Sequence, residues 1–477
     1  MSEGRHSDLQ GSEQPAGRVE QPVIRRYWWL KRAGVVVAAI VLLIVGLREI
    51  TNAVAVRRLH AEIEKLRAAG EPVLPEDFKF EAVPEEENMA PLLLAAMEAY
   101  VPAEKENIPF EQLVVDALNK KRREKAFEPE DVLSDPSQII TQRAEVDTFL
   151  EQNARCLELF REAAQRPRCD WGYRRLPDFG DKPPDNFKLI DVCKAALVAA
   201  VWENDRGNST AAYELVHDAL HVSRSVGSQS PYLIFTLIPI VIYSKATDIF
   251  ATLLATEIPH LDTAESIISI ELDTEAIQQA IANSIRTERA WFVRIAPALG
   301  ASDKLNATSA AESFLPRTFD FVHSYLLNPV FNTDAIRMLR LFTRFVRNAS
   351  IPDNEPILYD NEEMSFLNWE GKIQRISCIL SLICIPNLDR SIEGWRHART
   401  IAHLGGVMLA LRLYERDHGE FPETLAELVP IYMPYVPLDT TALPREVEYI
   451  KSPAGVTIGL RNEVEGKCVE YTLESRD

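Results

Sequence analysis

The longest uninterrupted apolar run of the chain lies near its N-terminus, over residues 33–47. Two tryptophans and a leucine at 28–30 lengthen this run, because Lys31 and Arg32 can extend their charged ends toward lipid headgroups. The tryptophan rings suit the interface between membrane and water. About 20 apolar residues cross a bilayer. Residues 28–47 are therefore predicted to enter the lipid bilayer as a single transmembrane helix.

The charges beside this run predict its orientation. Residues 25–32 hold four Lys and Arg side chains, whereas residues 48–55 hold only Arg48. Over about 20 residues on each side the two counts are equal. Because basic flanks stay in the cytoplasm, we expect a cytoplasmic, disordered tail at 1–24 and an extracytoplasmic bulk. Signal-peptide cleavage is the alternative, since Ala53-Val54-Ala55 fits the small-x-small rule.

Beyond the anchor, apolar residues recur mainly at helical spacing, for example at Val56, Leu59, Ile63 and Leu66. Gly, Pro and polar clusters separate the segments. The predicted helices cover residues 56–66, 88–100, 110–126, 138–165, 187–205, 209–226, 231–254, 372–385 and 392–418, with further helices within 261–350.

The segment 187–257 carries the clearest tertiary signal and is predicted to form three packed helices at the centre of the core. Its first two helices are similar to one tetratricopeptide-type hairpin, because Gly207, Ala212, Val216 and Ala219 fit the small-residue spacing. No second copy follows at a 34-residue offset. An ordinary helical hairpin is the alternative.

The C-terminal residues change to strand-like alternation. Runs at 447–450, 456–460 and 468–473 are joined by Gly-containing turns and predict a small antiparallel sheet on the end of the long helix. The expected fold class is mainly α: one transmembrane helix, an irregular helical bundle and this sheet. The expected divisions are 1–24 (tail), 25–47 (anchor), 48–136 (helical linker region), 137–400 (helical core) and 401–477 (long helix with sheet).

Charge excludes one class of partner. The chain has a net charge of −19; positions 1–47 hold six basic and four acidic residues, so the remainder has 46 basic and 67 acidic residues. Such a domain repels phosphate backbones, and we expect no nucleic-acid partner. The six cysteines form no C-x-x-C pair. Cys156 with Cys169, or Cys378 with Cys384, could form disulfides outside the cytoplasm, but buried free thiols are the favoured interpretation.

Recognisable catalytic motifs are absent: the sequence contains no Walker loop, dinucleotide fingerprint, Gly-x-Ser-x-Gly elbow or His-Glu-x-x-His. The best remaining candidate places Glu214, His217, Asp218 and His221 on one helical face. Histidines four residues apart can share a metal ion, and a second Glu-x-x-His pair occurs at Glu415 and His418.

The face of the first pair is also the polar one, so we interpret it as solvated and expect no metal site and no cofactor. Glu288 and Arg289 are predicted to form a buried ion pair with a structural role. The sequons at Asn208, Asn306 and Asn348 occur at about the frequency expected by chance. Catalytic residues therefore remain unknown from sequence.

Three stretches together resemble a family of membrane-anchored helical proteins of bacteria: Glu86-Glu87-Asn88-Met89-Ala90-Pro91-Leu92, the hairpin region 194–257, and Leu409–Pro437. The resemblance covers most of residues 50–460. It implies a protein of the cell envelope and brings no activity with it.

The last stretch also resembles the tail of type II secretion major pseudopilins. There, a long helix leads through Gly, an aromatic residue and Pro to a small sheet; the matching residues here are Tyr414, Gly419, Phe421, Pro422, Leu425, Leu428, Pro437 and Asp439. In pseudopilins a proline and usually a glycine follow the residue that corresponds to Asp439; here Thr440 replaces the proline, and the glycine is missing. Ala39 stands where prepilins have glutamate. The resemblance implies a shared C-terminal module without the calcium loop or the pilin signal.

Two functional hypotheses remain. In the first, the protein is a non-enzymatic interaction or scaffold component of the envelope, with protein partners there. In the second, it is a membrane-tethered enzyme, a hydrolase or a metal-dependent enzyme, whose site is assembled from dispersed residues. The absence of recognisable catalytic motifs favours the first.

Overall fold

The computed structural model describes residues 28–103, 129–178, 181–273, 275–299, 321–351, 355, 379–440, 444–461 and 468–475. The chain divides into two compact units, one ending at Val54 and the other running from Ala55 to Asp477. The predicted tail at 1–24 and the predicted helix at 110–126 lie outside the described residues.

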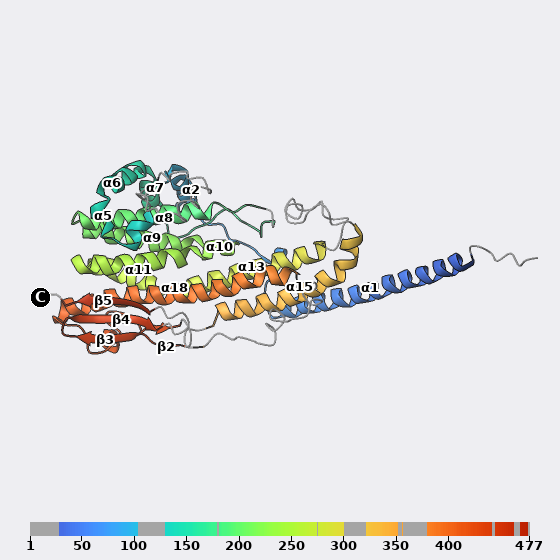
Figure 1. The fold of residues 1–477 in the computed structure, drawn as a ribbon. Coiled ribbons are helices and arrows are strands. Elements are labelled where there is room, and N and C mark those ends of the chain that lie inside the picture. The colour runs from blue at the N-terminus through green and yellow to red at the C-terminus, as the bar shows by residue number, and fades with distance from the viewer. Residues whose placement is uncertain are drawn as a thin grey trace, which may run out of the picture. The chain divides into compact units, whose positions relative to one another are not determined.

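The first unit consists, in its described part, of the N-terminal portion of helix α1 (Trp28–Ala68), drawn in blue in Figure 1. In its most apolar 18-residue window, no residue is buried by protein. The Arg32 guanidinium lies 3.6 Å from the Trp28 ring centroid, a cation–π contact. This helix is long and apolar enough to span a membrane, which supports membrane anchoring.

A second described segment, Leu233–Thr256, is also apolar enough to cross a bilayer, but over half of its 18-residue apolar window is buried within the protein. It belongs to the core: α8 (Asn186–Asp205), α9 (Ser209–Val226) and α11 (Ile238–Thr256) pack against one another (Figure 1). Three packed helices at 187–257 are thereby confirmed. The tetratricopeptide likeness of α8 and α9 stays a prediction.

Proline divides the third of these helices. The expected continuous helix from Pro231 to Leu254 is wrong, because a short α10 (Leu233–Thr236) precedes α11. Pro239 occupies the first turn of α11, where its missing N–H costs nothing.

The predicted long helix at 138–165 is also divided, into α5 (Gln138–Thr141), α6 (Arg143–Gln152) and α7 (Ala154–Ala164). The buried amide of Asn153 explains the second break, because it both donates to and accepts from the backbone of Val101. This pairing across 52 positions competes with helix continuation. Two further helices, α2 (Ala90–Ala99) and α4 (Pro129–Ser134), pack against α7 and α8 respectively.

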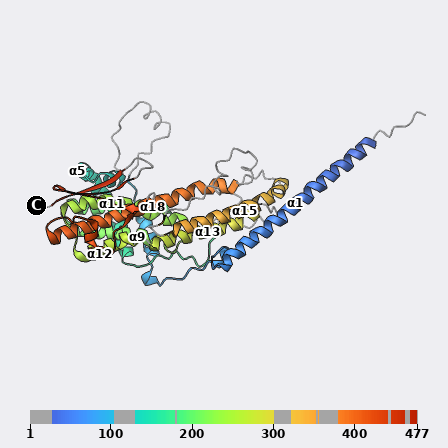
Figure 2. The ribbon, with the colours of Figure 1, turned by 90° about the horizontal axis from the view of Figure 1, so that it is seen from below.

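Four further helices lie in the part of the chain that the structure describes. They are α12 (Leu261–Leu272), α13 (Glu275–Leu299), α15 (Phe321–Ala349) and α18 (Ile379–His418). Helices α13 and α15 lie side by side, and α18 packs against α11, α12 and α15 (Figure 2). A break between residues 385 and 392 is wrong, since α18 is continuous there; residues 372–378 lie outside the described part. Packing of the buried residues of α18, which the structure describes from Ile392 onward, outweighs the unfavourable proline at position 386.

The C-terminal sheet is confirmed. Strands β3 (Glu448–Ser452), β4 (Gly455–Arg461) and β5 (Cys468–Glu474) pair antiparallel in that order, with Tyr449 opposite Ile458 and Ile458 opposite Tyr471. A two-residue pair, β1 (Leu438–Asp439) with β2 (Arg445–Glu446), precedes it. Buried side chains of β4 and β5 pack toward α18 and α11.

Candidate functional site

A groove of about 670 Å³ lies between α7, α9 and α12 and contains the histidine candidates. We call it the histidine groove. Its polar lining residues are Arg161, Gln165, Arg166, Glu214, His217, Asp218, His221, Asp262, Thr263 and Ser266. The sequence therefore correctly predicts that four of these side chains, those of Glu214, His217, Asp218 and His221, share one face of α9. In the structure this face lies against α7 and α12.

His217 connects the two walls of the groove. Its Nε2 lies 2.9 Å from Ser266 Oγ on α12, and its Nδ1 lies 3.6 Å from an oxygen of the Asp218 carboxylate. Asp218 is buried, with 6 % of its surface exposed, so the expectation of a solvated face is wrong for this residue. The hydroxyl and the imidazole lie within hydrogen-bond distance, as a nucleophile and a base do, whereas 3.6 Å is too long for a hydrogen bond between the imidazole and the Asp218 carboxylate.

His221 is held by the backbone. Its Nε2 lies 2.9 Å from the Arg166 carbonyl oxygen, and its ring stacks on His217 with centroids 6.3 Å apart. Burial, together with the adjacent His217, lowers the pKa of His221 despite the hydrogen bond to Arg166. Glu214 is exposed and pairs with Arg161 at 2.9 Å.

The second Glu-x-x-His pair has different surroundings. Glu415 is buried and ion-pairs with Arg412 at 2.6 Å, whereas His418 is exposed and stacks on Tyr414. Among the described residues, no group of three or more His, Cys, Asp or Glu side chains could hold a metal ion. The two pairs thus do not assemble the inward-facing ligand set of a di-iron bundle.

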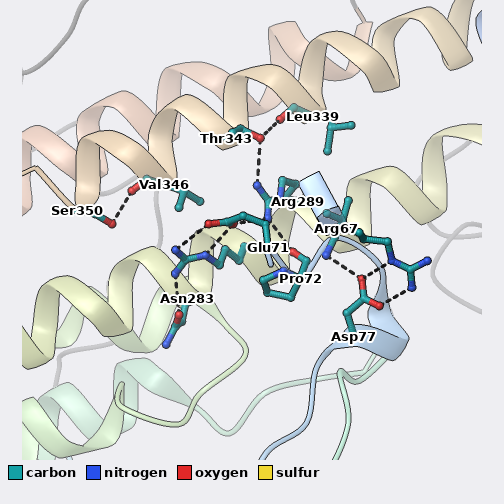
Figure 3. Close-up of polar contacts among 12 residues, drawn as sticks. Arg67, Glu71, Pro72, Asp77, Asn283, Arg289, Leu339, Thr343, Val346 and Ser350 are labelled. Carbon is teal, nitrogen blue, oxygen red and sulfur yellow. Dashed lines mark hydrogen bonds and ion pairs between the residues drawn. The ribbon is translucent and has the colours of Figure 1, made fainter. Parts of the chain in front are cut away.

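A second polar cluster joins the loop after α1 to α13 and α15 (Figure 3). Glu71 accepts hydrogen bonds from Arg286 Nε at 3.1 Å and from Arg289 Nη2 at 2.9 Å. Arg289, fully buried, also donates to the Pro72 carbonyl at 2.7 Å and to Thr343 Oγ1 at 3.0 Å. We call Glu71, Arg286 and Arg289 the Glu71 clamp.

The clamp corrects the predicted Glu288–Arg289 ion pair. Arg289 is buried and ion-paired, but its partner is Glu71, because neighbouring helical residues point about 100° apart. Burial raises the pKa of Glu288 to about 7, although its carboxylate accepts a hydrogen bond from the Leu233 backbone.

Apolar packing surrounds the clamp. Leu59, Ile63 and Val73 form a second core cluster with residues of α13 and α15. The one-turn helix η1 (Pro75–Asp77) closes the loop, and Asp77 accepts from the backbone N–H groups of Val73 and Leu74 and from Arg67. Although burial opposes it, the two arginines hold the pKa of Glu71 below its usual value.

A third feature, the buried carboxyl of Glu271, was not predicted from the sequence. Glu271 on α12 is fully buried, and neither carboxylate oxygen has a hydrogen-bond partner. It lies against Gly405 and Gly406 of α18, where an added Cβ would come within 3.5 Å of its side chain. Burial raises the pKa of Glu271 well above its usual value, because the charged form of the carboxyl would lie in the core without a hydrogen-bond partner.

The C-terminal module, which comprises the described residues after α18, is attached to that helix by specific hydrogen bonds. Gly419 ends α18 with a φ of +79°, and its N–H donates to the Glu415 carbonyl at 2.7 Å. In the segment that follows, the short helix η4 (Leu425–Leu428) is preceded by Thr424, which forms a capping box with Glu427. Arg412 donates to the Glu474 carbonyl at 2.8 Å, which fastens β5 to α18.

Three cysteines whose side chains the structure describes form no disulfide. Cys156, Cys169 and Cys193 are free and buried, as favoured from sequence. Burial raises the pKa of Cys156 to about 11 and of Cys193 to about 12, which keeps both thiols protonated.

Ser266, Glu71 and Glu271 escaped sequence reasoning. Ser266 meets His217 across 49 positions and Glu71 meets Arg289 across 218, so no local spacing pairs them. Comparison of the chain with protein-family models, curated proteins and solved structures finds no match.

Proposed function

We propose that this protein is a single-pass membrane protein whose helical body serves as an interaction or scaffold component of the cell envelope. One observation carries the proposal: α1 exposes its apolar side chains from Trp28 to Leu47, then buries Ala55, Leu59 and Ile63 in the body. Exposed apolar surface of this extent is unfavourable in water and favourable in a bilayer. The helical body, which is the second compact unit and starts at Ala55, thus begins within the helix that we assign to the membrane.

The polar clusters are consistent with a structural use of the body. The Glu71 clamp connects the loop after α1 to two long helices, and the hydrogen bond from Arg412 to the Glu474 carbonyl connects α18 to the sheet. Both hold segments that are far apart in sequence. A body stabilised in this way provides fixed surfaces for partners.

The proposed orientation places the N-terminus in the cytoplasm and the body outside it. Its support is the excess of basic residues at 25–32 over 48–55. A reporter enzyme that is active only outside the cytoplasm, fused after Asp477, should be active. If a second reporter, which works only in the cytoplasm, is active when fused to the same site, the orientation is the reverse.

Chemical cross-linking in native membranes tests the interaction itself. We expect specific envelope proteins to cross-link to the full chain and to disappear from the products when the cross-linker is quenched before addition. If no partner cross-links while the purified chain turns over a substrate, the interaction proposal is wrong.

The histidine groove favours a second candidate function, ester or amide hydrolysis. Ser266 Oγ would attack a carbonyl carbon, His217 Nε2 would take its proton and pass it to the leaving group, and water would then cleave the acyl-enzyme. The carrying observation is the 2.9 Å contact between these atoms.

An activity-based fluorophosphonate probe tests this second candidate. Labelling of the full chain that is lost in Ser266→Ala, and kept in the control Ser269→Ala on the exposed side of α12, would support it. Equal labelling of both variants, or none of the native chain, would rule it out.

A further inference from the structure

A second groove, of about 530 Å³, lies between α12 and the segment 430–435 of the C-terminal module. We call it the module groove. From α12 it is lined by Glu265, Ile268, Ser269 and Leu272, whose i, i+3, i+4 and i+7 spacing places them on one face. The opposite wall consists of residues 430–435, with prolines at both 430 and 434.

The walls of this groove are fixed by hydrogen bonds. Tyr435 donates its hydroxyl to the Leu272 carbonyl at 2.6 Å, and Tyr432 donates its hydroxyl to the Asp417 carboxylate at 3.0 Å. The backbone N–H groups of Tyr432 and Met433 both donate to the Leu428 carbonyl. The groove is therefore present before any partner binds, which reduces the entropy cost of binding.

The chemistry of the lining is apolar at the floor and acidic at the rim. Ile268, Leu272 and Met433 are buried beneath it, while Ile431 is 79 % exposed, more than any other large apolar side chain in the described part of the chain. Glu265 and Glu275 are exposed at the rim. Asp273, also at the rim, pairs with Arg224.

We infer that the module groove binds a basic segment of an envelope protein, in which Lys or Arg residues flank an apolar side chain. The apolar side chain would cover Ile431 and the groove floor, and the basic residues would meet Glu265 and Glu275. Acidic rims repel anionic lipid headgroups and a second copy of this chain, whose net charge is −19. The inference rests on the proposed interaction function and names the site and the partner's chemistry.

Site-specific photo-cross-linking tests the inference on the full chain in its native membranes. A benzoylphenylalanine replaces Ile431 in one variant and Phe187, which is 72 % exposed at the start of α8, in the matched control. We expect a product from position 431 that is absent from position 187, and a cross-linked partner peptide rich in Lys or Arg. Because rim charges steer association, Glu265→Lys with Glu275→Lys should lower the yield about five-fold.

Other outcomes overturn the inference. An acidic or uncharged cross-linked peptide, a product that is a second copy of this chain, or no product at 431 would each do so. Unchanged thermal unfolding of the charge variant excludes misfolding as the cause of a lost product. A partner that cross-links at other surface positions but not at 431 would leave the proposed interaction function standing and reject this groove.

Discussion

Replacing Glu71 with glutamine removes the carboxylate that Arg286 and Arg289 share. Arg289 is fully buried and would lose the carboxylate with which it forms an ion pair, so we expect a loss of about 2–4 kcal/mol in the free energy of unfolding. Because the folded-state pKa of Glu71 is lowered, its contribution is present above the unfolded pKa near 4.5 and is lost as pH falls through the folded value. Urea unfolding in detergent at several pH values measures both effects.

Glu76→Gln is the matched control for this variant, because Glu76 lies in the same loop with a mostly exposed side chain. It should change stability by less than about 0.5 kcal/mol. Equal effects of the two substitutions would show that the clamp does not stabilise the loop.

Glu271 predicts the opposite dependence on pH. Its folded-state pKa lies far above the usual 4.5, so the unfolded chain releases a proton that the folded chain retains. Stability should therefore fall as pH rises above about 4.5, by up to about 1.4 kcal/mol per pH unit, until the folded pKa is reached. Glu271→Gln should remove this slope, whereas Glu265→Gln, exposed on the same helix, should keep it. If the free energy of unfolding changes with pH equally in Glu271→Gln and in the native chain between pH 5 and 8, this account of the buried carboxyl is wrong.

At the level of single residues, the sequence predicted which side chains are unusual better than it predicted their partners. Arg289 is buried and ion-paired, as the sequence predicted, and His217 and His221 share a face, as helical spacing indicated. Their partners, Glu71, Ser266 and the Arg166 backbone, come from other elements. Helical spacing defines a face but not what packs on it.

At the level of elements, the three central helices offer a direct test of the core. Leu197 on α8 is fully buried, so Leu197→Asp should destabilise the chain by about 4 kcal/mol or more, because an unpaired charge would enter the core. Phe187→Asp, at an exposed position on the same helix, should have little effect. Soluble expression of the body and its thermal unfolding measure the difference. Unchanged unfolding of Leu197→Asp would place this face at the surface.

Helices and strands with strong periodicity were predictable, and their breaks were not. The three C-terminal strands lie within two residues of their predicted ends. The division of 138–165 depends on Asn153 pairing with Val101, and the continuity of α18 depends on packing against three other helices. Both are tertiary effects that override local propensity.

At the scale of the whole molecule, composition and hydropathy predicted the mainly helical class, the apolar N-terminal helix and the small sheet. They could not predict that the loop after α1 is clamped to α13 and α15, because Glu71 and Arg286 are 215 positions apart. The two grooves likewise depend on which helices become neighbours. Membrane anchoring is the part of the account with the strongest local signal and the one on which the proposed function depends.

Alkaline carbonate extraction of membranes tests this anchoring most directly. The full chain should remain in the membrane pellet, because residues 28–47 would have to leave the hydrocarbon to become soluble. A chain that begins at Ala55, the start of the second compact unit, should appear in the supernatant as the control. Full-length protein that retains residue 20 and is released into the supernatant by carbonate would contradict the account.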